Sequence, residues 1–220
     1  MIKDLLGVIS VKDQVITIDA IGCQTEIATI IAKGRGDYVL GLKGNQETLH
    51  EDVKLYFSDV ELTDSIKTPG FYKKTTEKAH GQIEIREYYQ TNDISWLSNK
   101  KPWLGLQTIG MVKTTCKSEK GESCEMRYFI SSLAPDIDLF SKAVRGHWSV
   151  ESMHWHLDVT FREDKNRTLE KIAAENMNIL RKLALSILKI FEMDKKHSLK
   201  KKRFAISCDF AGFADNLMAL

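Results

Sequence analysis

Several features of specialised proteins are missing from this 220-residue chain. The four cysteines show no CxxC spacing, which argues against a zinc knuckle or a disulfide framework and predicts free thiols in a reducing cytoplasm. No apolar run is long enough for a signal peptide or a membrane span, and the strongest one, residues 183–191, contains Lys189. Internal repeats and low-complexity tracts are also absent. These absences predict a soluble cytoplasmic protein that does not associate with a membrane.

The chain also has little excess of positive or negative charge, since its formal net charge is only +2. The total charge therefore indicates no nucleic-acid partner. The charges are nevertheless unevenly distributed along the chain, since residues 195–203 form a strongly basic run, KKHSLKKKR. A solvated surface is the simpler interpretation of such a run, and phosphate binding is the alternative. The remaining composition, 43% hydrophobic and 28% charged, is ordinary for a globular protein.

The first forty residues carry the pattern of an α/β fold. Residues 15–19 (VITID) predict a short buried strand, and residues 25–33 place isoleucines at i, i+3 and i+4, as on one face of a helix. Residues 38–42 (YVLGL) predict a second buried strand. A strand, a helix and a strand in this order predict two parallel strands joined by a right-handed crossover. A further helix is expected to turn three residues inward: Leu49, Val53 and Phe57.

The rest of the chain divides by its periodicity. Residues 1–67 are expected to form a partial α/β core, and residues 68–134 an inserted antiparallel β subdomain, because alternating β-rich runs are separated there by turn-like segments. Helical periodicity returns over residues 135–194, and residues 195–220 form a basic tail.

Polar residues follow both predicted parallel strands. Asp19 ends the first, and Lys43, Asn45 and Gln46 come directly after the second. Ligands of open α/β folds bind outside the carboxyl ends of parallel strands, so these residues are candidates for a site. The alternative is that Asp19 only caps the following helix, since Asp is a favourable cap residue.

A second set of polar residues lies in the segment SKAVRGHWSVESMHWHLDVTFRED. If that segment is one helix, spacings of 4, 3, 4 and 4 put five residues in a stripe on one face: His147, Glu151, His154, Asp158 and Arg162. The apolar residues around the stripe are numerous enough to bury most of the helix, and a buried polar stripe would need ions or partners. The alternative is that the stripe is the solvent side of an amphipathic helix.

Two metal chemistries fit a functional stripe. His147, Glu151 and His154 could bind zinc at helical spacing, although the HExxH arrangement is absent. Alternatively, Glu151 joins Asp19 in binding Mg²⁺, which prefers hard oxygen ligands. Carboxylates from a strand end and a distant helix could then hold metal ions for in-line phosphoryl transfer.

Five motifs resemble those of one enzyme family, in order and spacing: TIDAIGCQTEIA, DYVLGLKGNQETLHEDV, HGQIEIREYY, YFISSL and RGHWSVESMHWHLDVTFREDKNR. The chain is similar to the ISAs-type, or H-repeat-associated, DDE transposases from about residue 5 to its end. The resemblance implies an RNase H-like catalytic core with a β insertion between the second and third catalytic acids. It also implies cutting and joining of double-stranded DNA at insertion-sequence ends with Mg²⁺ or Mn²⁺.

The resemblance also assigns roles to single residues. Asp19 matches the second catalytic Asp of the family and Glu151 its catalytic Glu, and each would ligate metal. Related enzymes contact DNA near this Glu through a tyrosine, an arginine and a lysine, whereas this chain has Val144, His147 and Asp158 at those positions. The DNA contacts expected here are therefore Lys43, Asn45, Arg145 and His147.

The first catalytic Asp of the family lies on a strand upstream of the segment that matches this sequence. We therefore expect a truncated transposase that is inactive alone. Two further alternatives remain open: a DNA-binding remnant without catalysis, which could inhibit a full-length transposase by pairing with it, and a degraded product that does not fold. The partners expected besides DNA are a second copy, in a homodimer, or a full-length transposase.

Overall fold

The computed structural model describes residues 2–79, 81–97, 102–119, 121–193 and 197–218. The chain divides into two compact units, residues 1–147 and residues 148–220. Helix α5 (Ile137–Trp155) crosses the boundary between them.

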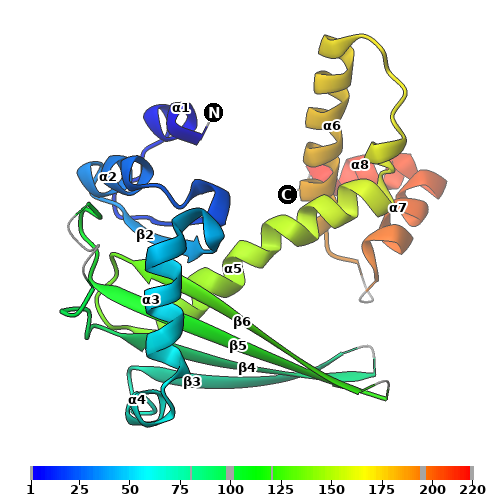
Figure 1. The fold of residues 1–220 in the computed structure, drawn as a ribbon. Helices are drawn as coiled ribbons and strands as arrows, with labels where there is room; N and C mark the ends of the chain where they lie inside the picture. Colours follow the sequence, from blue (N-terminus) through cyan, green and yellow to red (C-terminus); the bar gives the residue numbers. More distant parts are fainter. Residues whose placement is uncertain (1, 80, 98–101, 120, 194–196, 219–220) are drawn as a thin grey trace. The chain divides into compact units, whose positions relative to one another are not determined.

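Unit 1 is built on one six-stranded sheet in the order β1-β2-β6-β5-β4-β3 (Figure 1). Its strands are β1 (Val15–Ile18), β2 (Asp37–Leu42), β3 (Tyr72–Ala79), β4 (Gln82–Thr91), β5 (Thr108–Ser118) and β6 (Gly121–Ser131). β1 and β2 are parallel, with Val15 opposite Asp37, and all other neighbours are antiparallel. β1 stands at one end of the order, so one of its edges pairs with no strand in the described ranges.

The predicted strand, helix and parallel strand are confirmed, but the first strand is half-buried rather than buried and ends at Ile18. Helix α2 (Thr25–Lys33) has the predicted bounds, and its Ile27 and Ile31 are buried because the 3.6-residue period points them to the same side. Short 3₁₀ turns follow the two strands, η1 (Ala20–Gly22) after β1 and η2 (Gly44–Gln46) after β2. Helix α1 (Ile2–Val8) precedes β1 and contributes Leu6 to the core.

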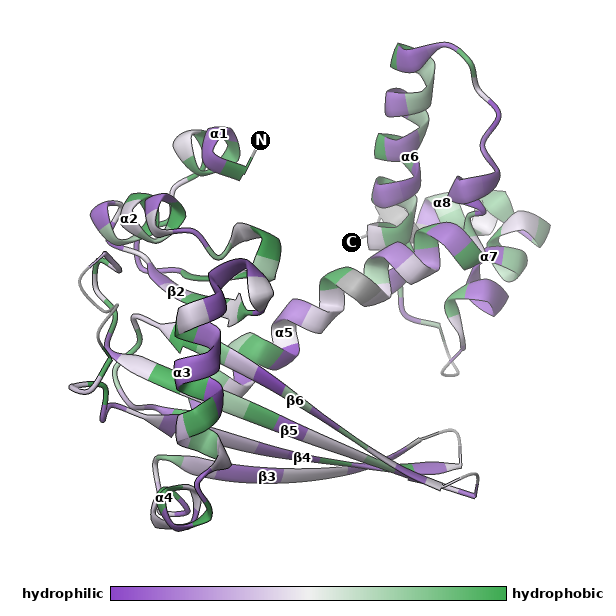
Figure 2. Cartoon of the chain, in the orientation of Figure 1, coloured by the Kyte–Doolittle hydropathy of each residue, from purple (hydrophilic) through white to green (hydrophobic). Residues whose placement is uncertain are grey.

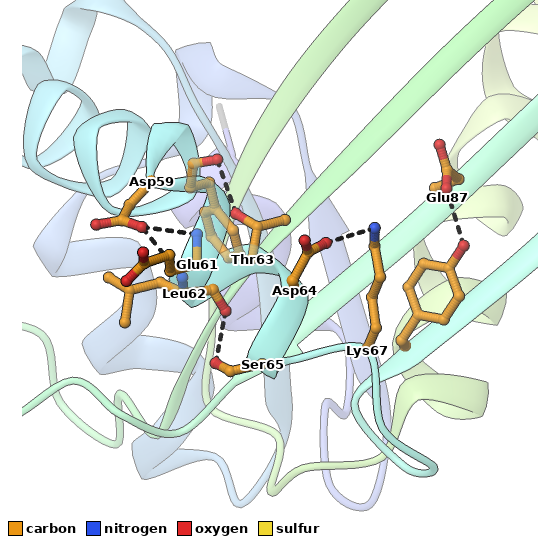
Figure 3. Close-up of polar contacts among 10 residues, drawn as sticks. Asp59, Glu61, Leu62, Thr63, Asp64, Ser65, Lys67 and Glu87 are labelled. Atoms are coloured by element: carbon orange, nitrogen blue, oxygen red, sulfur yellow. Dashed lines mark hydrogen bonds and ion pairs between the residues drawn. The ribbon is translucent and has the colours of Figure 1, made fainter.

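Helix α3 (Glu47–Ser58) buries the three residues that the sequence predicted: Leu49, Val53 and Phe57. The short helix α4 (Val60–Ser65) follows at once, because Asp59 ends one helix and begins the next. The Asp59 carboxylate accepts hydrogen bonds from the backbone N–H groups of Glu61 and Leu62, at 2.9 and 3.1 Å (Figure 3). After α4, Lys67 donates to Asp64 at 2.7 Å.

Both faces of the sheet are covered by helices. The alternation along β2 shows this, since Tyr38 and Leu40 join the core beneath α2 and α3 while Val39 joins the core beneath α5. Phe140 and Val144 are the α5 side chains of that second core. Figure 1 shows α3 crossing one face of the sheet. Unit 1 is therefore a mixed α/β fold.

The antiparallel strands predicted over residues 68–134 are present, and they continue the sheet of β1 and β2. β6 pairs with β2, with Ile130 opposite Leu40, and β5 pairs with β6. Ile109 and Ile130 are fully buried in the same core as Leu40. The sequence boundary at 67/68 thus separates two parts of one sheet, and unit 1 extends beyond residue 134 into α5.

Unit 2 is helical in its described residues. After the end of α5 come the π-helical turn η4 (His156–Thr160), the 3₁₀ turn η5 (Glu163–Lys165), α6 (Lys171–Ile190), α7 (Leu199–Cys208) and α8 (Phe210–Met218). Leu157, Leu185 and Leu188 are its buried hydrophobic side chains. Hydrophobic and hydrophilic residues both occur along the length of α6 (Figure 2). Within the described ranges, no helix is long and apolar enough to cross a membrane.

Candidate metal and DNA site

Asp19 follows the last residue of β1 and stands at the N-cap position of η1 with an extended backbone. Its carboxylate accepts no capping hydrogen bond from that turn, and its side chain is 61% exposed. The capping alternative is therefore wrong for this carboxylate. An exposed carboxylate at a strand end keeps its oxygen atoms available for a cation.

The loops after the two parallel strands are joined beside Asp19. The side-chain amide of Asn45 donates to the carbonyl of Ala20 at 2.5 Å, and that of Gln46 donates to the carbonyl of Cys23 at 3.0 Å. These bonds fix the loop after β1 against the loop after β2. The sequence predicted that polar residues at the ends of the two strands lie close together. The two hydrogen bonds between these loops confirm that prediction.

Lys43 brings a positive charge to the same place. Its Nζ lies 3.9 Å from Oδ1 of Asp19, and its side chain is largely exposed. Gly41 is close as well, since a Cβ atom built on it would lie 3.6 Å from the same oxygen. A lysine beside a metal-ligating carboxylate is suited to contact a phosphate oxygen, because both the metal ion and the ammonium attract negative charge.

Helix α5 contacts strand β1 itself. Nδ1 of His147 lies 3.2 Å from Oγ1 of Thr17, two residues before Asp19. Sequence reasoning missed Thr17, and its only signal was a hydroxyl on the strand that ends at Asp19. The predicted DNA contact His147 therefore also has a partner within the protein.

The other predicted DNA contact on α5, Arg145, forms an ion pair. The Arg145 guanidinium donates a hydrogen bond to the Glu77 carboxylate on β3 at 3.2 Å. The same carboxylate forms an ion pair with Arg86 of β4 at 3.0 Å. The hydrogen bond from Arg86 lowers the pKa of Glu77, and the charge of Arg145 lowers it further. Arg86 is almost fully buried and also contacts Glu84. This network ties the β3–β4 hairpin to α5, and no pattern in the sequence predicted it.

The five-residue stripe is wrong beyond residue 155. α5 ends at Trp155, and the π-helical turn that follows has a wider period, which rotates later residues off the α-helical face. Arg162 has a left-handed backbone with φ 54°, so it lies outside any helical stripe. Asp158 and Arg162 therefore do not continue the face that begins at His147.

The apolar residues around the stripe are also less buried than predicted. Val144 and Leu157 are buried, but Val150, Trp155 and Val159 are each exposed by about half. The helix thus leaves apolar surface open in its second half.

Glu151 lies in α5, one helical turn after His147. Its side chain falls outside the described ones, and the residue belongs to unit 2. Among the described residues, no group of three or more His, Cys, Asp or Glu side chains could hold a metal ion. The Asp19 carboxylate is a hard oxygen donor, a type of group that suits Mg²⁺ better than zinc.

Part of the basic run serves the protein itself. Lys202 donates to the carbonyls of Leu188 and Phe191, at 3.1 and 2.5 Å, and so caps the end of α6. Arg203 donates to the carbonyl of Thr160 and lies over the ring of Phe161. These two cations therefore have structural partners within the protein, although Arg203 also remains exposed to solvent.

The other cations of the run differ. Lys195 and Lys196 lie outside the described residues, whereas Lys200 and Lys201 on α7 are both exposed. With His197 and Phe204 they line a surface pocket of about 620 Å³. This is the part of the run that could reach phosphates.

Comparison with known proteins identifies the class. The Transposase DDE domain family matches residues 1–187. This chain belongs to that family, in its H-repeat-associated branch. It is 35% identical over 207 residues to the Escherichia coli O157:H7 protein named "Putative transposase YncI", covering 92% of this chain and 52% of that protein. No solved structure matches the chain significantly.

The chain also matches only about half the length of two further relatives. The Escherichia coli K12 protein named "H repeat-associated putative transposase YhhI" is 32% identical over 209 residues, which cover 91% of this chain and 54% of that protein. A Xanthobacter autotrophicus protein described as an uncharacterized protein in the dhlA 3' region is 41% identical over 135 residues, covering 61% of this chain and 44% of its own length. The chain thus spans about half the length of the curated relatives it matches.

Proposed function

We propose that this chain carries part of an RNase H-like transposase core that cuts and joins double-stranded DNA at insertion-sequence ends by metal-dependent phosphoryl transfer. Asp19 and Glu151 would each ligate Mg²⁺ or Mn²⁺. A bound divalent ion would polarise the scissile phosphate and lower the pKa of the attacking water. The observation that carries the proposal is the exposed, uncapped Asp19 carboxylate where the ends of two parallel strands are tied together.

The protein's own groups would position the DNA. Lys43, 3.9 Å from Asp19, would contact a phosphate oxygen next to the metal. Asn45 would act by fixing the Asp19 loop through the Ala20 carbonyl. His147 and Arg145 would orient α5 against unit 1, through Thr17 and Glu77, besides any contact with DNA.

The active enzyme would need a third acidic residue. The family resemblance places it on an upstream strand, and β1 has an edge that no described strand covers. We propose that this strand pairs there and that the chain without it binds DNA but does not cut it.

The test compares the chain alone with a form that includes the upstream strands, on DNA carrying the element's ends. The longer form is expected to nick this DNA with Mg²⁺ or Mn²⁺, and Asp19→Asn or Glu151→Gln to reduce nicking by at least about 10³-fold, as for loss of an essential catalytic group. Asp13→Asn is the matched control, because Asp13 is exposed and has φ 58°, which asparagine tolerates. Nicking that survives both variants would overturn the proposal.

DNA binding without chemistry is the second candidate. It is favoured by the exposed Lys200 and Lys201 of α7. In this case, affinity for DNA would fall steeply with salt and would be unchanged by Glu151→Gln. No nicking by the longer form, together with such binding, would support it over catalysis.

A further inference from the structure

Helix α6 has a second apolar face in addition to its buried one. Leu185 and Leu188 are buried within unit 2. On another side, Ile172, Ile179, Leu183 and Ile190 are exposed by 56 to 71%. Apolar residues of this size exposed in a row indicate a surface that another helix covers.

The exposed face has the spacing of a coiled-coil seam. Steps of four and three residues alternate along α6 through six exposed positions: Ile172, Asn176, Ile179, Leu183, Ser186 and Ile190. This is the heptad repeat in which a and d residues face a partner helix. The 20-residue helix provides a seam about 30 Å long, at about 1.5 Å per residue.

The seam shows the same order of residue types when it is followed from either end. It runs apolar, polar, apolar, apolar, polar, apolar. When two copies lie antiparallel, Ile172 therefore meets Ile190 of the second copy, Asn176 meets Ser186, and Ile179 meets Leu183. Every layer pairs like with like, which is the self-complementarity that a two-fold interface requires.

The flanking charges support the same orientation. In antiparallel coiled coils, g positions face g positions, and here they are Glu175, Lys182 and Lys189. The register above places Glu175 opposite Lys189 of the second copy, twice, by symmetry. In a parallel pair Glu175 would face Leu180, so no ion pair would form. Lys182 lies opposite itself across the axis, where Leu180 on the other flank adds an apolar contact.

The polar layer can also be satisfied. The Ser186 hydroxyl donates to the carbonyl of Lys182 at 3.0 Å, which leaves its oxygen free to accept from the Asn176 amide of the second copy. A polar layer of this kind fixes register at a cost in stability.

We propose that two copies of this chain associate through an antiparallel pairing of α6. The inference is independent of the DNA chemistry, because none of the six seam residues belongs to the proposed metal or DNA site. Its occupant is a second copy because the seam is self-complementary in the order of its residue types and in the charges of Glu175 and Lys189.

The test is the mass of the full chain by sedimentation equilibrium over a range of concentrations. We expect a dimer of twice 25.1 kDa. The double variant that combines Ile179→Asp with Leu183→Asp is expected to be a monomer. Its helix content should be unchanged, because both side chains are exposed in the single chain. A monomeric wild-type chain, or a dimer that persists in the double variant, would overturn the proposal and leave the face to another segment or protein.

A charge swap tests the orientation. Glu175→Lys and Lys189→Glu alone are each expected to raise the dimer dissociation constant, by about 2- to 5-fold per ion pair lost. The double variant restores both pairs with reversed sign and is expected to regain wild-type affinity. Failure of the double variant to recover would overturn the antiparallel register. Val150→Asp, on exposed apolar surface outside α6, is the control and should leave the dimer unchanged.

Discussion

His147 Nδ1 lies 3.2 Å from Thr17 Oγ1, across 130 residues of sequence. The contact ties α5 to the strand that ends at Asp19. Glu151, the proposed catalytic residue, follows His147 by one turn in the sequence of the same helix.

Thr17→Val should weaken that attachment. The change keeps the shape and removes the oxygen, so we expect unit 1 to lose about 1 kcal/mol of unfolding free energy. Urea denaturation monitors the loss. Ser65→Ala is the control, because its hydroxyl bonds only locally to Leu62 and should change stability by less than about 0.5 kcal/mol. Equal effects of the two variants would contradict the attachment.

Two glycines should respond oppositely to alanine. A Cβ on Gly110 would lie 2.4 Å from the Phe140 ring, so Gly110→Ala is expected to destabilise unit 1 by about 1–3 kcal/mol. Gly146, within α5, has nothing within 4 Å of a new Cβ, so Gly146→Ala should stabilise by about 0.5–1 kcal/mol. Shifts of the denaturation midpoint in the same direction would show that the α5–β5 contact is not as described.

The lysines of α7 should separate into two functions. Lys202→Met removes the cap on the carbonyls at the end of α6 and should cost unit 2 about 1 kcal/mol. Lys200→Met should leave stability unchanged but lower DNA affinity and reduce the slope of log affinity against log salt by about 0.9. Thermal unfolding and fluorescence anisotropy measure the two effects. A loss of stability in Lys200→Met equal to that in Lys202→Met would contradict this division.

Unit 2 should lose stability in mild acid. Burial, aided by the charge of Lys189, lowers the pKa of His156 below its usual value of about 6.5. Protons then bind the unfolded chain more tightly, so the contribution of His156 is complete above about pH 6.5 and is lost as the pH falls through the lowered pKa. Melting curves at about pH 7.5 and about pH 5.5 should show a smaller loss in His156→Gln than in wild type. The exposed His154→Gln serves as control and should behave like wild type.

The four thiols should differ in reactivity. Cys23 is fully buried, and burial raises the pKa of its thiol to about 12. Cys124 and Cys208 are exposed. We expect iodoacetamide to modify these two in the folded protein and Cys23 only after unfolding, as read by peptide mass spectrometry. Modification of Cys23 at the rate of Cys208 would contradict its position in the core.

Local patterns in the sequence predicted much of unit 1. The spacing of Ile27 and Ile31 predicted α2 with its correct bounds, and the run at residues 38–42 predicted β2. The meeting of polar residues at the two strand ends could also be predicted, because the carboxyl ends of parallel strands share an edge. The stripe on α5 failed after residue 155, because the polar and apolar spacing gave no signal of a π-helical turn.

The sequence by itself determined the strand, helix and strand of residues 15–42 and that Asp19 and Lys43 follow neighbouring strands, because these depend on periods of two and 3.6 residues. The helices α7 and α8 in the predicted basic tail were not predicted. The tertiary structure decided the rest. Only folding showed that β6 pairs with β2 and that Lys202 and Arg203 bind backbone carbonyls. These contacts join residues far apart in the chain, and their formation depends on which buried surfaces and unpaired polar groups meet, which no local pattern encodes.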